Sequence, residues 1–542
     1  MLTAYVVDSI YDYVADDGQV TLREAITAAN SNMAFSGLPA GDEAGDVIRF
    51  APRLLGQTIE WEVGDITITD DLVISGNPAA PIMISADFDH RFFVIDSVEP
   101  VQISGLNLVA GDAGAGNGGA ILLTRGPLIL SSMRMIANDA QRGGAVFCAG
   151  DGDLQIIDSD FQLSKPLEGT VYAEPGSRIE IRGTTFLENG SKLGAAVFAE
   201  ECEVLLDNCI FRANEGSYGG VIYGRNVDLI RVTNCEFVEN RALRQGGAIY
   251  LTGGRMTIHG SVFVSNLAKE NSGSSVGDGG ALWLAQGSYT TLGDSRFTGN
   301  YAHRNGGVVF ATSGATAGFH GILFENNQAH GQLEGNGGGV GYARQATLRW
   351  IQCTAIGNRA DGALGAGGAV NSFQGTFNSR GSSYRQNTSH LLGGAIAAFG
   401  GFLRIENSLF GDQFSASKNL AGAGPFEEGY GGAIYVAHTD RFFVSGCNFV
   451  WSRAEQNGGA IYVADDATVR FTTAPSSMTD SFAGLHGGAL YIAGRLVVEV
   501  PLTIARNKSI DYGGGIYSPT PFTIPPLISF QNNDPDDYAF GP

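Results

Sequence analysis

The sequence has little positive charge. It contains 33 lysine and arginine residues against 55 aspartate and glutamate residues, which gives a formal net charge of −22. Proteins that bind nucleic acid usually carry a basic surface, and anionic membranes attract basic segments for the same reason. We therefore expect neither nucleic acid nor a membrane surface as a partner. An acidic surface instead keeps a long protein soluble.

Long apolar runs are also missing. No stretch approaches the ~20 apolar residues of a membrane-spanning helix, so we expect no direct membrane span in this chain. A signal sequence is not recognisable either, because Met1-Leu2-Thr3 leads almost directly into a strand-like segment. The chain is therefore expected to be either cytoplasmic or a mature fragment of an exported protein behind an artificial Met, and we favour the fragment.

Cysteine is too sparse to cross-link 542 residues. The six cysteines form no CxxC pair with the spacing of a zinc site. We expect all six to be buried free thiols that pack as small hydrophobic groups. They are Cys148, Cys202, Cys209, Cys235, Cys353 and Cys447.

Glycine is abundant, at 78 residues, and 44% of the chain is hydrophobic. The glycines lack the G-X-Y period of collagen, and the apolar content is too high for a disordered chain. They fall instead in a repeated Gly-Gly-Ala-aliphatic-aromatic motif, whose 15 copies start 25 to 38 residues apart. Clear copies start at Gly246, Gly431, Gly458 and Gly487. Looser copies start at Gly118, Gly143, Glu168, Gly194, Gly219, Gly279, Gly306, Gly337, Gly367, Gly393 and Gly513.

A Phe-x-x-Asn motif alternates with the glycine motif, as at Phe186, Phe211 and Phe237. Short apolar runs separated by glycine, asparagine or aspartate predict strands. A coil of about 25 residues with three strands is one turn of a parallel β-helix, whereas propeller blades run to ~40–50 residues. Glycine supplies positive φ at corners, and stacked asparagines can share amide hydrogen bonds. We predict an all-β solenoid of about 15 or more turns, which bury apolar residues by stacking.

The ends depart from the repeat. Thr21 and Glu24 fit a capping box at the start of a helix, and Leu22, Ala25 and Ile26 lie on its apolar face. We expect this helix to cap the first turn. Three regions follow: a capping region with the first turns at 1–100, β-helix repeats at 101–518, and a C-terminal cap or tail at 519–542. Prolines and the Asp534-Pro535-Asp536-Asp537 segment are expected to stop strand pairing in the last region.

Two segments resemble known families. Val20-Thr21-Leu22-Arg23-Glu24-Ala25 resembles the CSLREA element that opens many large bacterial surface proteins, with Val20 in place of its cysteine, and 45–50 looks like the same proteins. The paired glycine and Phe-x-x-Asn repeats are similar to those of chlamydial polymorphic outer-membrane proteins and related adhesins, over residues 1 to about 518. The resemblance implies a right-handed β-helix on an extracellular or cell-surface protein with a role in adhesion or envelope structure. It implies no catalytic residues.

The aromatic position of the glycine motif predicts a binding surface. Alternation along a strand places the two aliphatic neighbours on one face and the aromatic residue on the other. An exposed aromatic ladder would suit sugar rings or a partner protein; alternatively, loops cover it or the aromatic residues form the core. The candidate binding residues are Tyr223, Tyr250, Trp283, Phe310, Tyr435 and Tyr462, together with His303 and Arg304. Three consecutive repeats lack the aromatic residue, at Gly341, Asn371 and Ala397.

A second column lies three residues after each Phe-x-x-Asn asparagine. It brings His303, His330, Asp361 and His390 into one register, with Arg304 and Arg359 beside them. In a polysaccharide lyase, a cation neutralises a uronate carboxylate and a base removes the adjacent proton. We assign His330 or His390 as that base, Arg304 or Arg359 as the cation, and Asp361 as the residue that orients a histidine. The alternative is a set of ordinary solvated turn residues.

The sequence indicates no cofactor except calcium. Asp8, Asp12, Asp16 and Asp17 cluster near one predicted turn, where their oxygens could hold Ca²⁺, although no EF-hand is present. Two functions remain open. We favour an exported scaffold, adhesin or envelope protein that binds a polysaccharide, another surface protein or a second copy of itself. The alternative is a polysaccharide-active enzyme, a lyase rather than a hydrolase.

Overall fold

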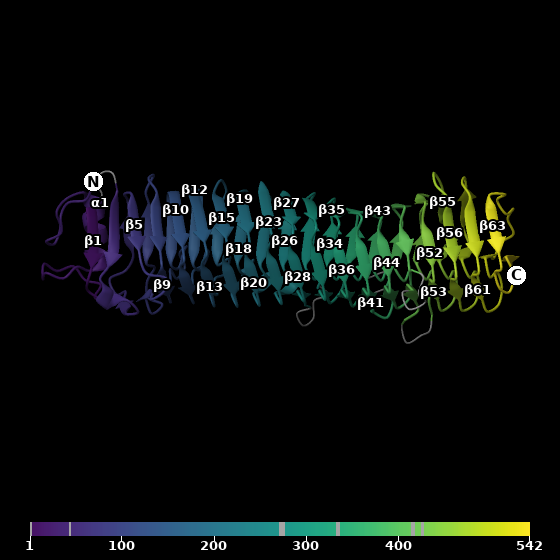
Figure 1. Cartoon of the computed structure of the whole chain (residues 1–542), viewed down its shortest axis with the longest axis horizontal. Coiled ribbons are helices and arrows are strands. Elements are labelled where there is room, and N and C mark those ends of the chain that lie inside the picture. The colour runs from purple at the N-terminus through teal and green to yellow at the C-terminus, as the bar shows by residue number, and fades with distance from the viewer. Residues whose placement is uncertain are drawn as a thin grey trace. The chain divides into compact units, whose positions relative to one another are not determined.

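The computed structural model describes residues 3–42, 45–269, 277–331, 337–412, 418–423 and 428–541. It divides into two compact units, one of Met1–Ala242 with Ala248–Met256 and the other of Leu243–Gly247 with Thr257–Pro542. We call them unit 1 and unit 2. Each is a stack of short parallel strands, coloured purple to teal in unit 1 and teal to yellow in unit 2 (Figure 1). The chain makes about 17 turns, so the predicted parallel β-helix is confirmed.

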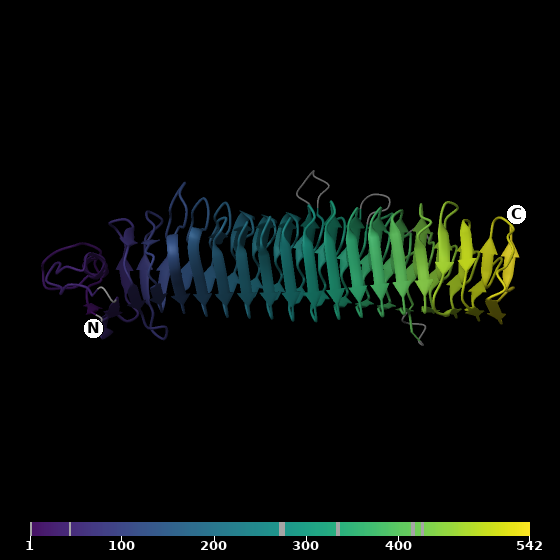
Figure 2. The ribbon, with the colours of Figure 1, turned by 90° about the horizontal axis from the view of Figure 1, so that it is seen from above.

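One turn of unit 1 contains four strands, which pair in parallel with their equivalents in the next turn (Figure 2). Two of the four strands belong to one sheet, which we call the first sheet; in the turn given below they are β15 and β18. The Phe-x-x-Asn strand forms the second sheet, and the short strand after the asparagine forms the third. A representative turn is β15 (Arg178–Arg182), β16 (Thr185–Leu187), β17 (Gly190–Leu193) and β18 (Val197–Glu200). The next turn comprises β19 (Glu203–Asp207), β20 (Ile210–Arg212), β21 (Glu215–Tyr218) and β22 (Ile222–Arg225).

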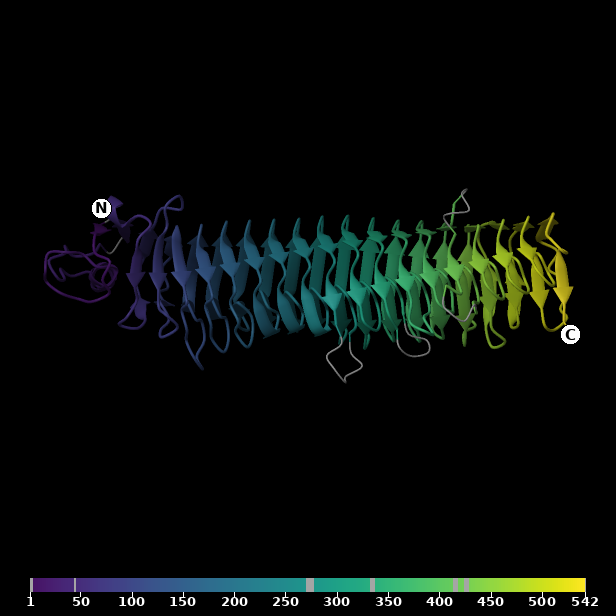
Figure 3. The same cartoon turned by 90° about the horizontal axis from the view of Figure 1, so that it is seen from below.

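Unit 2 repeats this arrangement (Figure 3). One turn comprises β34 (Val309–Thr312), β35 (Thr316–His320), β36 (Leu323–Glu325) and β37 (Gln328–Ala329). The next comprises β38 (Gly341–Arg344), β39 (Thr347–Ile351), β40 (Thr354–Ile356) and β41 (Arg359–Ala360). It is followed by β42 (Val370–Phe373), β43 (Thr376–Arg380), β44 (Ser383–Arg385) and β45 (Thr388–Ser389). Then come β46 (Ile396–Phe399), β47 (Phe402–Glu406), β48 (Leu409–Phe410) and β49 (Leu420–Ala421).

The phenylalanines of the Phe-x-x-Asn motif stack inside the coil. In unit 1 the Phe186 and Phe211 ring centroids lie 5.3 Å apart. In unit 2 one turn has Ala355 in the phenylalanine position, and Trp350 from the neighbouring strand fills the space. The Trp350 ring stacks on Phe324 at 4.7 Å and on Tyr384 at 5.8 Å. The core therefore remains continuous where the motif is lost, because close-packed interiors leave few voids.

The motif asparagines form buried hydrogen-bonded ladders, as predicted. In unit 1 the amide of Asn189 donates to Oδ1 of Asn214 at 3.1 Å. In unit 2 the amide of Asn300 donates to Asn327 at 2.9 Å, and that of Asn327 to Asn358 at 3.0 Å. Each side chain also accepts a backbone N–H from the previous turn, as Asn327 does from Asn300 at 2.9 Å. The ladder thus satisfies buried backbone groups at a corner where strand pairing stops.

The two glycines of the motif have different roles. Gly306, the first of its pair, has a φ of +65°, the left-handed region that glycine adopts without strain. Gly307, the second, lies so close to the next turn that an added Cβ would be 2.1 Å from the carbonyl oxygen of Gly339. The first position therefore requires glycine for its backbone conformation, and the second requires it because a side chain would not fit.

The predicted helix is α1 (Leu22–Ser31), and the capping box is present. The Glu24 N–H donates to Thr21 Oγ1 at 3.1 Å, and the Thr21 N–H donates to the Glu24 carboxylate at 2.9 Å. The apolar face packs against β1 (Thr3–Val7), β2 (Asp46–Phe50) and β4 (Ile66–Ile68) at the N-terminal end of unit 1. The helix therefore caps the first turns and buries their otherwise open end.

Strand pairing does not stop after residue 518, which corrects the prediction for the C-terminal region. No strand forms at 519–526, where the prolines lie. Beyond them, β63 (Ile528–Gln531) pairs with β60 (Leu502–Ala505), and β64 (Tyr538–Phe540) pairs with β62 (Ile516–Ser518). Phe530 and Asn533 form a further Phe-x-x-Asn motif, and Asn533 accepts the amide of Asn507 at 3.1 Å. This motif restores the fold of the repeat after the prolines.

Candidate functional site

The aromatic column forms a stacked ladder that is largely buried. In unit 1 the Tyr223 and Tyr250 rings are 5.0 Å apart with planes 6° from parallel. In unit 2 Tyr435 and Tyr462 stack at 5.2 Å, whereas Trp283 and Phe310 are only 9% and 5% exposed. The predicted exposed ladder is therefore wrong in one respect: the rings face away from the core aliphatic residues, but they cover one another's faces.

Residues of the preceding turns also cover the ladder from the side. In unit 1 the ring of Tyr218 lies edge-on to Tyr250 at 5.4 Å, and in unit 2 Tyr430 lies edge-on to Tyr462 at 5.4 Å. Burial raises the pKa of Tyr172 to about 12. Sugar rings need an open aromatic face. The ladder therefore serves mainly to pack successive turns, an arrangement that differs from both predicted alternatives, cover by loops and a place in the core.

The register also corrects the gap in the aromatic column. Tyr342, not Gly341, pairs with Phe310 on one side and with Asn371 on the other. Three consecutive glycines at 337–339 shifted the sequence alignment by one residue. Tyr342 stacks on Phe310 at 5.4 Å, so only Asn371 and Ala397 interrupt the ladder.

The histidine column is brought together in unit 2. His303, His330, Asp361 and His390 each follow a strand of the third sheet and donate a backbone N–H to the preceding turn at 3.0–3.1 Å. The His303 and His330 rings lie 5.7 Å apart, and His330 Nδ1 is 3.3 Å from Asp361 Oδ1. The carboxylate of Asp361 therefore lies where the sequence analysis placed the residue that orients a histidine.

Asp361 is surrounded by donors. Arg359 Nε lies 3.5 Å from Asp361 Oδ2, and Gln328 Nε2 donates to the same oxygen at 2.5 Å. The Asp361 side chain is 12% exposed, whereas that of His330 is 46% exposed. Burial lowers the pKa of His390, although the charge of Asp361 acts in the opposite direction. The lowered pKa favours a neutral imidazole. Three of the four candidate catalytic residues are thus in contact, and the fourth lies on the adjacent turn.

Arg304 has a different environment from Arg359. Its Nε donates to Asp278 Oδ1 at 2.8 Å, and the Asp278 side chain is fully buried. Asn305 also donates to Asp278, at 3.1 Å. Arg304 therefore neutralises a buried carboxylate of the solenoid, whereas the half-exposed guanidinium of Arg359 can reach solvent.

The four N-terminal aspartates do not gather into one cluster. Asp12 is buried in a 2.8 Å ion pair with Arg23, whose guanidinium also lies 4.5 Å from the Trp61 ring centroid. Asp8 accepts the Val20 N–H, and Asp17 accepts that of Gln19. Asp16 lies beside Gly37. Within the described ranges, no three histidine, cysteine or acidic side chains are placed to hold a metal ion. Calcium binding remains a prediction without a formed site.

The cysteines are confirmed as six buried free thiols. Cys209 donates from Sγ to the Ile181 carbonyl at 3.4 Å, and its own N–H donates to Cys235 Sγ at 3.4 Å. Cys353 and Cys447 occupy the equivalent position in unit 2, where serine is the alternative. Burial raises the pKa of Cys353 to about 12 and that of Cys447 to about 11. The thiols of Cys353 and Cys447 therefore remain protonated and serve as core residues.

Sequence analysis missed a row of arginines on the outer face of the first sheet of unit 2. Strand pairing aligns Arg349 with Asn378, Arg404, Phe443 and Arg470. The outward direction of these side chains could have been predicted from the sequence, because each residue is flanked by two inward-facing residues in its strand. The variable repeat length hid it, since the arginines are 55 and 66 residues apart.

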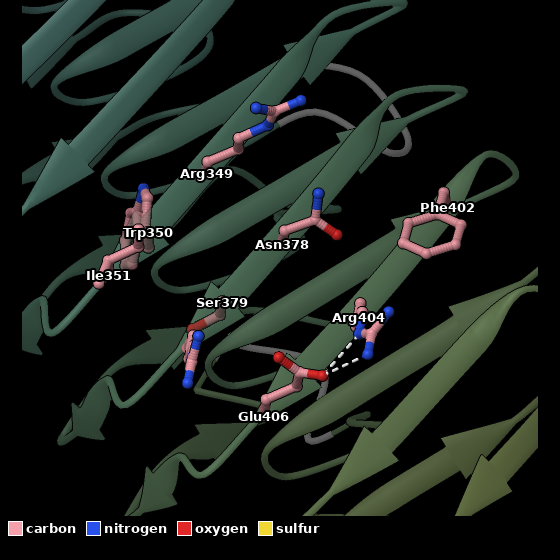
Figure 4. A pocket seen from close by; sticks show the side chains of 9 residues that line it. Arg349, Trp350, Ile351, Asn378, Ser379, Phe402, Arg404 and Glu406 are labelled. Carbon is pink, nitrogen blue, oxygen red and sulfur yellow. Dashed lines mark hydrogen bonds and ion pairs between the residues drawn. The ribbon is translucent and has the colours of Figure 1, made fainter. Parts of the chain in front are cut away.

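A hollow of about 360 Å³ lies in this row. Figure 4 shows Arg349, Asn378 and Arg404 on three successive strands, with Phe402 on the same strand as Arg404. Arg404 pairs with Glu406 in its own strand, Nε to Oε1 at 2.7 Å. Oδ1 of Asn378 is buried and has no hydrogen-bond partner. The hollow thus combines positive charge, an amide side chain and an aromatic side chain.

Comparisons with known proteins agree with the β-helix fold. A family model described as a right-handed β-helix region matches residues 113–263. The chain is also 31% identical over 178 residues to the probable autotransporter YfaL of Escherichia coli (strain K12). That alignment covers 27% of this chain and 14% of the relative's length. No solved structure matches. No helix in the described part of the chain is both long and apolar enough to cross a membrane.

Proposed function

We infer that this chain is a surface-exposed β-helical scaffold that acts by binding, as an adhesin or envelope component. The observation that carries this inference is the similarity of about a quarter of the chain to a probable autotransporter. An autotransporter is an exported protein. The resemblance of the repeats to those of bacterial surface proteins agrees with an extracellular location.

The way in which the fold uses its polar residues supports binding over catalysis. The thiols are buried, and the motif asparagines hydrogen-bond within the corners. What remains on the outside is a set of side chains repeated from turn to turn. Such repetition presents the same chemical group many times at a fixed spacing, which suits multivalent contact with a polymer or with another surface protein.

Surface exposure can be tested with antibodies raised against residues 101–518. Intact cells of the organism that makes the protein should be labelled, to the same extent as cells whose envelope has been permeabilised. An antibody against a cytoplasmic protein, which should label permeabilised cells only, controls for leakage. Labelling of this chain only after permeabilisation would contradict the inference.

A polysaccharide lyase is the second candidate, and the contact between His330, Asp361 and Arg359 favours it. Arg359 would neutralise a uronate carboxylate, and His330 or His390 would accept the proton from the adjacent carbon. The electron pair then forms a carbon–carbon double bond, the bond to the leaving sugar oxygen breaks, and that oxygen takes a proton from water. Burial lowers the pKa of His390, which favours the unprotonated form that such a base needs.

The lyase is tested by the ultraviolet absorbance of its unsaturated product. The purified chain is incubated with alginate, pectate, glycosaminoglycans and sulfated algal polymers, with calcium or with EDTA. Product that disappears in His330→Ala and in His390→Ala would favour the enzyme over the scaffold. His438→Ala is the matched control, because His438 also pairs with an aspartate, Asp466, away from the column. Absence of product, or an equal loss in His438→Ala, would eliminate this candidate.

A further inference from the structure

We propose that the arginine row of unit 2 binds an extended anionic polysaccharide that runs across the strands of the first sheet. This inference deepens the proposed scaffold function, since it names the ligand class and the face that binds it. The face is defined by Arg349, Asn378, Arg380, Arg404 and Arg470, with Phe402 beside them.

The spacing of the arginines suits a polymer. In the aligned column, arginine occupies alternate turns, at 349, 404 and 470, with Asn378 and Phe443 between them. Parallel strands lie ~4.8 Å apart, so neighbouring arginines of the column are roughly 10 Å apart. A rigid sheet therefore presents positive charge at a regular interval along a straight line. A linear polymer with regularly repeated carboxylate or sulfate groups has the complementary pattern.

The charge of this face contrasts with that of the whole chain. Strands β35, β39, β43 and β47 contain three arginines and a single acidic residue, Glu406, in a protein with a net charge of −22. In the part of the chain that the structure describes, Arg349 and Arg380 have no carboxylate within ion-pair distance. Their charges are therefore available to a ligand, and guanidinium groups bind carboxylate and sulfate oxygens through paired, charge-assisted hydrogen bonds.

On the equivalent face of unit 1, the two arginines of β15 are neutralised by neighbouring carboxylates. Arg178 lies 3.3 to 3.5 Å from carboxylates of Asp153, Glu180 and Glu203 on its own and both adjacent strands. Arg182 also pairs with Glu180. The same fold thus carries arginines with several carboxylate partners, such as Arg178 in unit 1, and arginines without one, such as Arg349 in unit 2. The guanidinium groups of Arg349 and Arg380 are thus not used within the sheet and remain available for binding.

The remaining groups of the hollow fit a sugar. Asn378 lines the hollow between Arg349 and Arg404, and a side-chain amide can exchange hydrogen bonds with sugar hydroxyls. The half-buried ring of Phe402 offers an apolar surface for the C–H face of a sugar ring.

The surface beyond the hollow is open in the direction of β35. Gly318 pairs with Arg349 in register, and nothing lies within 4 Å of the position where a Cβ would be. Its backbone does not have the positive φ that would require glycine. The glycine therefore keeps this part of the face free of side chains, so that a polymer chain can pass beyond Arg349.

A polysaccharide fits this face better than a nucleic acid. Nucleic-acid binding draws most of its affinity from many simultaneous phosphate contacts on a broadly basic surface. Here the basic residues form one narrow row, and the rest of an acidic chain would repel a densely charged polyanion. A polysaccharide with more widely spaced charges avoids much of that repulsion.

The test measures dissociation constants by isothermal titration calorimetry with four probes. They are oligogalacturonate, which carries carboxylates, dextran sulfate, unmodified dextran, and a single-stranded DNA oligonucleotide. We expect binding to one or both of the first two, weakening as salt rises, and none to unmodified dextran. The first two probes distinguish carboxylate from sulfate recognition. Tighter binding of DNA, or binding to none of the probes, would overturn the proposal.

Two double variants with the same change of charge locate the site. Arg349→Gln with Arg404→Gln should weaken binding at least about tenfold, because each removes a charge-assisted hydrogen-bonding group. Arg178→Gln with Arg182→Gln, on the equivalent face of unit 1, is the matched control and should leave affinity within about twofold. Equal losses in the two variants would show non-specific attraction and would refute the assignment. Circular dichroism and thermal unfolding verify that both variants are folded.

The ligand assignment and the scaffold function can be refuted separately. Antibody labelling of intact cells depends on where the protein is located, not on what the arginine row binds. Surface labelling without binding to any anionic polymer would refute the ligand assignment alone. Binding in vitro by a protein that is not exposed on cells would refute the scaffold function instead.

Discussion

The asparagine ladder allows a quantitative prediction for Asn327→Ala. The Asn327 side chain is fully buried and makes four hydrogen bonds. Its Oδ1 accepts the N–H and the amide of Asn300, both at 2.9 Å, and its amide donates to the Phe297 carbonyl at 2.9 Å and to Asn358 Oδ1 at 3.0 Å. Alanine cannot replace any of these bonds.

The expected cost follows from the groups that lose their partners. The N–H of Asn300 and the carbonyl of Phe297 would remain buried without this side chain, and each such group costs ~1–3 kcal/mol. We therefore expect unit 2 to lose about 2–5 kcal/mol of stability against local opening. Because each 1.4 kcal/mol is about a factor of ten in an equilibrium constant, the Asn300 amide should exchange with deuterium more than tenfold faster.

The assay is hydrogen–deuterium exchange of the peptides that contain these residues. Asn448→Ala is the matched control, because Asn448 is exposed and accepts a single hydrogen bond, from Ser477. It should change exchange little. Unchanged protection of Asn300 in Asn327→Ala would refute the view that the ladder stabilises the corner.

An aspartate at the same position adds a pH test. In Asn327→Asp the carboxylate would face the Phe297 carbonyl and Asn358 Oδ1, and burial would raise its pKa above the unfolded value of ~3.9. Stability is then lost as pH rises above about 4, where the unfolded state is ionised but the folded state resists ionisation. Asn327→Asp should therefore be closest to the native protein in acid and furthest from it at neutral pH. A pH-independent difference between the two would refute the reasoning.

Three further predictions concern the core, the cap and a titrating histidine. Phe211→Ala should destabilise unit 1 by about 3–5 kcal/mol in thermal or denaturant unfolding, because its ring is buried between two others; a loss below about 1 kcal/mol would contradict this packing. Thr21→Ala should cost ~0.5–2 kcal/mol by removing the helix cap, with Thr21→Ser as the control that retains it. Burial lowers the pKa of His390, so its contribution to stability is lost as pH falls below the unfolded value of ~6.5. Local deuterium exchange near His390, corrected for intrinsic rates, should therefore increase in acid and lose this dependence in His390→Gln.

Most of the fold was predictable because each motif occurs many times at a regular period, so each copy supports the same prediction. A single Phe-x-x-Asn motif would mean little, but repeated at a regular period it predicts a stacked ring and an amide ladder. The capping box could be read from Thr21 and Glu24 because it depends on four consecutive residues. The pairing beyond residue 526 was missed because the prolines outweighed the less obvious motif at Phe530 and Asn533.

The candidate site was predicted less completely. The column of His330, Asp361 and His390 was found because each residue follows its motif asparagine at the same distance. The aromatic ladder was assigned to the correct side of the strand, but its burial depends on neighbouring turns such as that of Tyr218. The prediction for Gly341 failed because a shift of one residue moves a side chain to the opposite face of a strand.

The sequence by itself determined the period, the strands, the corners and the buried polar ladder, because these depend on short-range patterns repeated along the chain. Only the tertiary structure decided which side chains on different turns face solvent together. Arg349, Arg404 and Arg470 lie in one row because parallel pairing aligns strands whose separation in sequence varies with each turn. Turn length is free to vary at the corners, whereas the pairing of backbone groups fixes the register of the strands.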